Sequence, residues 1–232
     1  MAGPTARLDE IISTLKSMAN PHNVAGMARF GINAANTLGV SVPQMRKLAA
    51  AIKKDHALAR QLWETGIHEA CIVATMIDDP KQLTPQQMDS WALDFDSWDV
   101  CDQACMGLFS RTPLGIEKAH EWSLRSEEFV KRAGFALMAS LALGKKDVSE
   151  GQLAAFLPDI EREAGDERNF VKKAVNWALR QVGKKNLRLN RLAVEAAERI
   201  RKQDSKSARW IAADALRELT GEPVRSRLNK KP

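Results

Sequence analysis

Apolar residues recur along this chain every three to four positions, the spacing that places side chains on one face of an α-helix. A first stripe of this kind is formed by Leu8, Ile11, Ile12, Leu15 and Met18. Residues 67–77 are almost wholly apolar, which predicts a helix at the centre of the fold. Runs of β-branched residues with period-two alternation, typical of strands, are absent. The pattern therefore predicts an all-α protein of about a dozen helices.

Capping residues mark where the predicted helices begin. Thr84-Pro85-Gln86-Gln87 and Ser149-Glu150-Gly151-Gln152 are capping boxes. Asp166 and Ser205 also stand at the starts of apolar stripes. The expected helices include residues 6–19, 23–28, 55–65, 67–77, 127–143, 150–164, 167–182 and 206–219.

A weak internal repeat lies in the second half of the chain. The segment 129–133, Phe-Val-Lys-Arg-Ala, recurs 41 residues later as Phe-Val-Lys-Lys-Ala at 170–174, and Ala-Leu-Arg at 178–180 recurs 37 residues later. Helix pairs that repeat near 40 residues are typical of HEAT-like solenoids, which stack into a curved array with a concave groove. We expect one domain over residues 1–221 and a basic, disordered tail over 222–232.

Charge is distributed unevenly along the chain. Residues 165–232 hold 18 Lys and Arg against 8 Asp and Glu, a net charge of +10, whereas the whole chain carries +6. A basic end on a mildly acidic body favours a polyanionic partner, although a basic helical surface without a partner has the same pattern. No apolar run approaches the length of a membrane span and no signal-peptide core is present, so we expect a cytoplasmic protein.

The three cysteines and four histidines do not predict a metal or a disulfide. Cys71, Cys101 and Cys105 are odd in number and lie inside apolar helical patterns, so we expect buried free thiols. The histidines do not pair with the cysteines at metal-ligand spacing, and we expect neither a metal nor a cofactor.

Residues 94–102, Asp-Phe-Asp-Ser-Trp-Asp-Val-Cys-Asp, concentrate candidate chemistry. Ser97 or Asp96 is placed to cap a helix on which Trp98 and Asp102, four residues apart, share one face. An indole beside a carboxylate suits a planar cation or a sugar that becomes cationic in a transition state. The alternative is a core tryptophan beside a solvated acidic face. Asp94, Asp96 and Asp99 lack calcium-type spacing, and capping by Asp96 with Asp99 is the favoured interpretation.

Basic side chains fall on the candidate inner helices of the second half. These are Lys131, Arg132, Lys172, Lys173, Arg180, Arg209 and Arg217. Trp177 lies four residues after Lys173 and three before Arg180, and aromatic and basic side chains together suit a nucleic acid. A core role for Trp177 is the alternative. We interpret Trp63, Trp91, Trp122 and Trp210 as packing residues.

Three motifs, in order, resemble the DNA alkylation repair family of HEAT-like-repeat DNA glycosylases, the AlkD type. They are residues 97–102 (SWDVCD), 129–133 (FVKRA) and 170–180 (FVKKAVNWALR), and the resemblance extends from about Phe30 to Leu219. Residues 30–32 (FGI) and 42–48 (VPQMRKL) also match the family's first helices.

The resemblance implies hydrolysis of the N-glycosidic bond of N3- and N7-alkylated purines in double-stranded DNA, without base flipping. It places Asp102 on the catalytic aspartate, Trp98 and Trp177 on the two tryptophans beside the lesion, and Arg132 on an arginine that binds the DNA backbone. We add Lys173 and Arg180 to the backbone-binding set. Some members carry a tyrosine near the first helices; this chain contains none, and Phe30 would stand in without the hydroxyl.

Non-catalytic DNA-binding relatives also belong to this family, so a HEAT-repeat DNA-binding protein is the alternative function. A protein-interaction scaffold is a weaker one. The expected partner in either leading case is double-stranded DNA, with alkylated bases for the enzyme, and no obligate protein partner or membrane is implied. We expect association with the nucleoid when the protein is bound to DNA.

Overall fold

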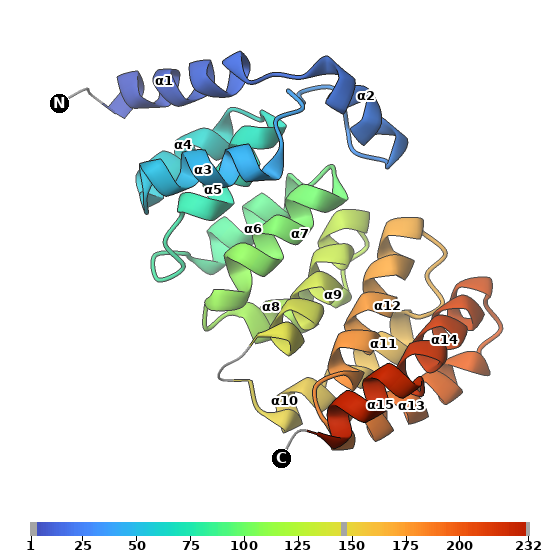
Figure 1. Cartoon of the computed structure of the whole chain (residues 1–232). Coiled ribbons are helices and arrows are strands. Elements are labelled where there is room, and N and C mark those ends of the chain that lie inside the picture. Colours follow the sequence, from blue (N-terminus) through green and yellow to red (C-terminus); the bar gives the residue numbers. More distant parts are fainter. Residues whose placement is uncertain (1–3, 145–147, 231–232) are drawn as a thin grey trace. The chain divides into compact units, whose positions relative to one another are not determined.

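The computed structural model describes residues 4–144 and 148–230, and these residues form helices and no strands (Figure 1). None of the described helices combines the length and the apolar character that crossing a bilayer requires. The first unit contains α1 (Pro4–Ser17), α2 (Pro21–Arg29), α3 (Val42–Ile52), α4 (His56–Glu64), α5 (His68–Ile77), α6 (Pro85–Leu93), α7 (Trp98–Gly107) and the 3₁₀ helix η1 (Phe109–Arg111). The second contains α8 (Gly115–Ser123), α9 (Glu128–Leu143), α10 (Glu150–Ala154), α11 (Leu157–Glu163), α12 (Asn169–Gly183), α13 (Leu187–Arg201), α14 (Lys206–Leu219) and α15 (Glu222–Asn229).

The chain divides into two compact units, Met1–Thr112 and Pro113–Pro232. The expectation of one domain over residues 1–221 stays a prediction. In the first unit α5 is the central helix and packs against α3, α4 and α7. Nearly all of its side chains are buried, as its largely apolar sequence predicts. The indoles of Trp63 and Trp91 stack beside it with ring centroids 4.0 Å apart.

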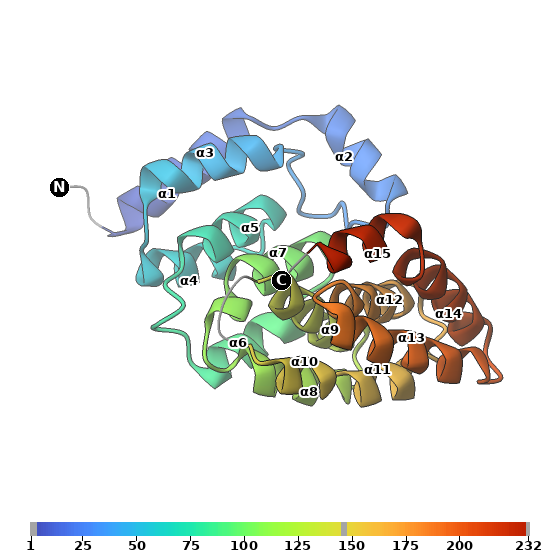
Figure 2. The ribbon, with the colours of Figure 1, turned by 60° about the horizontal axis from the view of Figure 1, so that its bottom comes forward.

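The second unit is built on α9 and α12, which lie side by side (Figures 1 and 2). Phe129 and Phe170, equivalent residues of the internal repeat, are in contact, with ring centroids 5.3 Å apart. The Arg132 guanidinium on α9 donates a hydrogen bond to the Phe170 carbonyl oxygen at 2.7 Å. The two copies of the motif thus lie at the starts of neighbouring, packed helices, as a helical repeat requires.

Gly134 allows α8 to approach α9 closely. A Cβ atom built on Gly134 would lie 2.6 Å from the Ser123 backbone nitrogen and 3.0 Å from the Ala119 carbonyl oxygen. Both atoms belong to the backbone of α8, which cannot rotate away as a side chain would. Glycine therefore sets the spacing of this helix pair.

The observed helices match most of the expected ones to within a few residues, but some regions differ. The helix expected over 150–164 is two helices, because Pro158 cannot continue a helix without clashing with the carbonyl of Ala154, where α10 ends. Asp166 does not cap α12; its carboxylate binds Arg168, and the helix begins at Asn169. Ser205 caps α14 as expected, with its hydroxyl accepting from the Ala208 N–H.

Residues 222–229, expected to be part of a disordered tail, form α15. Pro223 lies in its first turn, and Val224 and Leu228 are buried one turn apart on the same face. Burial of this small apolar face stabilises the basic segment as a helix packed against the second unit.

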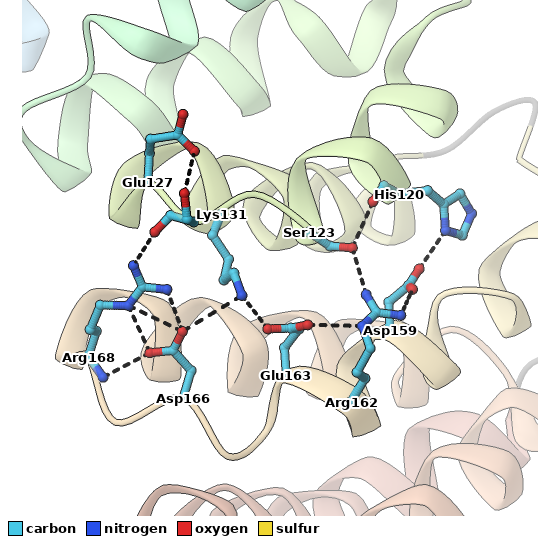
Figure 3. A network of polar contacts seen from close by, with 10 residues as sticks. His120, Ser123, Glu127, Lys131, Asp159, Arg162, Glu163, Asp166 and Arg168 are labelled. Atoms are coloured by element: carbon cyan, nitrogen blue, oxygen red, sulfur yellow. Dashed lines mark hydrogen bonds and ion pairs between the residues drawn. The ribbon is translucent and has the colours of Figure 1, made fainter.

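A network of ion pairs joins α8, α9 and α11 to the segment before α12 (Figure 3). Lys131 on α9 pairs with Glu163 and lies 4.0 Å from Asp166. On the other side, Arg162 pairs with Asp159 at 2.6 Å, and Asp159 binds His120 at 2.5 Å. The sequence suggested that Lys131 lines a groove. Lys131 is only 9% exposed, however, and its charge is paired within the second unit.

Candidate nucleic-acid interface

Trp98 is the first residue of α7, and its indole is held by the segment that follows α2. The indole Nε1–H donates a hydrogen bond to the Phe30 carbonyl oxygen at 3.1 Å. Trp98 is half-buried, whereas the Phe30 side chain is 74% exposed. Phe30 therefore fixes the indole through its backbone, a function that does not depend on which side chain it carries.

Asn33 forms a second link between the same two segments. Its backbone N–H donates to the Ser97 hydroxyl at 2.9 Å, and its side-chain amide donates to the Asp96 carboxylate at 2.6 Å. Ser97 is the N-cap residue of α7 but forms no capping hydrogen bond. The capping expected of Asp96 is also not observed, because its carboxylate accepts from Asn33 instead. The start of α7 is thus fixed by tertiary contacts.

Asp102 lies one helical turn after Trp98 on α7, so the two side chains project from one face, as the spacing predicts. Asp102 is half-buried. The two cysteines of this helix, Cys101 and Cys105, are fully buried, and like Cys71 they form no disulfide, as expected. The α7 surface therefore presents an indole and a carboxyl group together.

Asp99 accepts a hydrogen bond from the buried His68 on α5, whose Nε2 is 2.9 Å from Asp99 Oδ2. Burial lowers the pKa of His68, but the hydrogen bond and charge of Asp99, helped by Glu69 and Asp96, outweigh it, so the pKa is raised. Asp99 Oδ1 is buried without a hydrogen-bond partner. The charge of this carboxylate is therefore poorly compensated, and a protonated imidazole beside it is more strongly stabilised.

The raised pKa of His68 predicts how stability depends on pH. The folded state binds the proton more tightly than the unfolded chain, so its contribution is fully present below the unfolded pKa of about 6.5. The contribution is lost as the pH rises through the folded pKa. The melting temperature should fall between about pH 6 and pH 8 in the wild type, and fall less in His68→Gln. Parallel thermal-melt profiles of the two proteins over this range would contradict the assignment.

A cavity of about 730 Å³ lies in the first unit next to residues 94–100. Its lining includes the stacked Trp63 and Trp91, Asn33 and the carboxylates of Asp94 and Asp96. Asp94 accepts from the Trp63 indole N–H at 2.9 Å. Burial of Cys71, with the charges of Asp96 and Asp94 nearby, raises the pKa of this lining thiol to about 12, which keeps it protonated and unreactive.

In the second unit, Trp177 and Lys173 lie one turn apart on α12. Trp177 is half-buried, and its indole Nε1–H donates to the Gln181 side-chain oxygen at 3.1 Å in the amide orientation that satisfies both groups. Lys173 is exposed and has no acidic partner among the residues that the structure describes. Both side chains are thus available at the surface of the unit.

The two arginines predicted to bind the DNA backbone have partners within the second unit. Arg132 is 6% exposed and anchors the first turn of α12 through the Phe170 carbonyl. Arg180 pairs with Glu218 at 2.9 Å and Asp214 at 3.3 Å on α14. A phosphate would have to compete with these contacts, so the role of both arginines in binding DNA stays a prediction.

Trp210 is the site feature that the sequence interpretation missed. Trp63, Trp91 and Trp122 are buried packing residues as expected, but Trp210 on α14 is 43% exposed. The Lys172 ammonium lies 5.3 Å from the centroid of its ring. Within the described residues no group of three or more His, Cys, Asp or Glu side chains is arranged to hold a metal ion.

The chain belongs to the DNA alkylation repair enzyme family, whose model matches residues 11–219. The match spans both units and includes Trp98, Asp102, Arg132 and Trp177. A search of curated proteins gives no match. The match to the family model confirms the family expected from the three motifs.

The fold has a close counterpart among solved structures. A protein from "a new family of proteins related to the HEAT-like repeat DNA glycosylases with affinity for branched DNA structures" superposes with a TM-score of 0.80, at 22% identity over 95% of each chain. This likeness confirms the all-α, HEAT-like repeat fold. A designed armadillo repeat protein in complex with a (KR)4 peptide matches with a TM-score of 0.35, 14% identity and coverage of 80% of this chain and 84% of that chain. So low a score defines no common fold.

Proposed function

We propose that this protein is a monofunctional DNA glycosylase that hydrolyses the N-glycosidic bond of N3- and N7-alkylated purines in double-stranded DNA, without flipping the base. The observation that carries the proposal is the start of α7, where Trp98, oriented by the Phe30 carbonyl, shares a helix face with Asp102. Membership of the DNA alkylation repair enzyme family gives this pair its chemical context.

The chemistry follows from the charge of the substrate. An alkylated purine is already cationic and leaves readily, so positive charge moves to the deoxyribose as the bond breaks. In the proposal, ionised Asp102 stabilises that charge and orients a water molecule toward the anomeric carbon. Trp98, and Trp177 from the second unit, contact the sugar through their indole faces. No cofactor enters these steps.

Binding of the DNA backbone is assigned to basic side chains of the second unit. Lys173 is the most accessible of the three proposed contacts, since it is exposed and unpaired in the described chain. Arg132 orders the start of α12, the helix that carries Lys173 and Trp177, and thereby positions both. Each phosphate that such a side chain neutralises releases counterions and makes binding depend on salt.

The test is release of base from duplex DNA that contains 7-methylguanine. Purified protein in excess over DNA should release the modified base much faster than the spontaneous rate, measured by separation of the free base. Undamaged duplex of the same sequence is the control and should release nothing. Absence of release, with salt-dependent binding retained, would reject the enzyme.

A non-catalytic DNA-binding protein is the second candidate. It is favoured by the solved relative described as having affinity for branched DNA, which shares this fold. The two candidates differ in the base-release assay, because a binding module would bind DNA without accelerating base loss.

A further inference from the structure

The amino-terminal ends of α12 and α14 meet in the second unit, and an exposed indole stands at this junction. Glu167, just before α12, accepts hydrogen bonds from the Ser205 hydroxyl at 2.8 Å and the Ser207 N–H at 3.1 Å. These two bonds hold the start of α14 against the start of α12. Trp210 follows in the second turn of α14 and is 43% exposed.

Lys172 on α12 covers part of the Trp210 ring, with its ammonium 5.3 Å from the ring centroid. A cation within about 6 Å of an indole face is attracted to the ring and holds it in place. Since nearly half of the residue remains exposed, the indole is both oriented and accessible.

The surroundings of the indole are basic. Lys206, the first residue of α14, is exposed and has no acidic partner in the described part of the chain, and the same holds for Lys173 on α12. Arg209 is exposed and pairs with Asp204 at 3.2 Å. The acidic residues at this junction, Glu167 and Asp204, leave an excess of positive charge. The start of a 14-residue helix adds partial positive charge of its own.

We propose that Trp210 and Lys172 form a platform on which one unpaired DNA base stacks, while Lys206 contacts a neighbouring phosphate. An indole set among cations matches both parts of a nucleotide, the flat base and the anionic backbone. Bases in intact duplex are stacked on each other and do not offer a free face. The platform therefore recognises DNA that carries an unpaired base, such as a bulge or a single-stranded overhang, and adds this preference to the proposed duplex binding.

The experiment compares Trp210→Ala with wild type on two fluorescently labelled probes, a 20-base-pair duplex and the same duplex with a five-nucleotide single-stranded overhang. Both probes are undamaged, so the result is independent of base release. Affinity for the overhang probe should fall about 5- to 150-fold, the range expected for loss of one stacked base. Affinity for the duplex should change less than about twofold. Trp210→Phe, which keeps an aromatic face, should retain most of the preference.

Leu187→Ala is the matched control, because Leu187 is similarly exposed, at 47%, on the neighbouring α13. This variant should bind both probes as the wild type does. The proposal is overturned if Trp210→Ala leaves binding of the overhang probe unchanged, or if it weakens both probes equally. Lys206→Ala should reduce the slope of log affinity against log salt by about 0.7 to 0.9. An unchanged slope would show that Lys206 does not contact a phosphate.

Discussion

Replacement of Asp102 by asparagine is expected to lower the rate of 7-methylguanine release by about 100- to 1,000-fold, with binding of duplex DNA retained. Asparagine keeps the shape of the side chain but removes the charge that, in the proposed mechanism, stabilises the cationic sugar. A preorganised group directed at a developing charge contributes about 3–4 kcal/mol to the transition state. The measurement is single-turnover base release, with binding of undamaged duplex followed in parallel by fluorescence anisotropy.

Two further variants make this result specific. Asp96→Asn removes a charge from the same segment, while its remaining oxygen still accepts from Asn33, so base release should stay near the wild-type rate. Trp98→Ala should lose at most about 30-fold, because a cation–π contact contributes roughly 0.5–2 kcal/mol. An Asp102→Asn protein that releases base at the wild-type rate would refute the catalytic assignment.

Replacement of Glu69 by alanine is expected to lower the free energy of unfolding by about 3 kcal/mol or more. Glu69 is fully buried on α5, and its carboxylate accepts the backbone N–H groups of Leu38, Gly39 and Val40 at 2.8, 2.6 and 3.2 Å. Alanine would leave three donors without their acceptor, and each buried unsatisfied group costs about 1–3 kcal/mol. Urea denaturation followed by circular dichroism measures the loss.

The control for this variant is Glu64→Ala, which removes an exposed glutamate from the end of the neighbouring α4. Its effect should stay within about 0.5 kcal/mol. If the two variants were equally stable, the carboxylate of Glu69 would not be what holds residues 38–40. The same segment follows Phe30 and Asn33, so Glu69→Ala should also lower base release by loosening the support of Trp98.

Much of the fold could be predicted because helix starts are encoded locally. Ser205 illustrates this, since a hydroxyl at the N-cap needs only the next three residues to act. The helix α13 was not assigned from sequence, although the sequence contains a signal for it. The N-cap residue Asn186 precedes three apolar residues spaced four positions apart, Leu189, Ala193 and Ala197. The break at Pro158 could likewise have been found from the proline alone.

The candidate site was predictable in its residues but not in their environments. The pairing of Trp98 with Asp102 on one helix face follows from a spacing of four. The contact between Trp98 and the Phe30 carbonyl spans 68 positions, and no local pattern encodes it. Lys131 and Lys172 occupy equivalent positions of the repeat, yet one is buried against Glu163 and the other covers an exposed indole. Their neighbours in space, which the repeat does not specify, decide the difference.

The close approach of α8 and α9 at Gly134 has a consequence for anyone who builds on this scaffold. Designers commonly replace helical glycines with alanine to gain stability, and at Gly26, where a Cβ would meet nothing within 4 Å, that rule applies. At position 134 the methyl group would enter space that the backbone of the adjacent helix already occupies. A redesigned or consensus sequence must therefore keep glycine there, whatever helix propensity recommends.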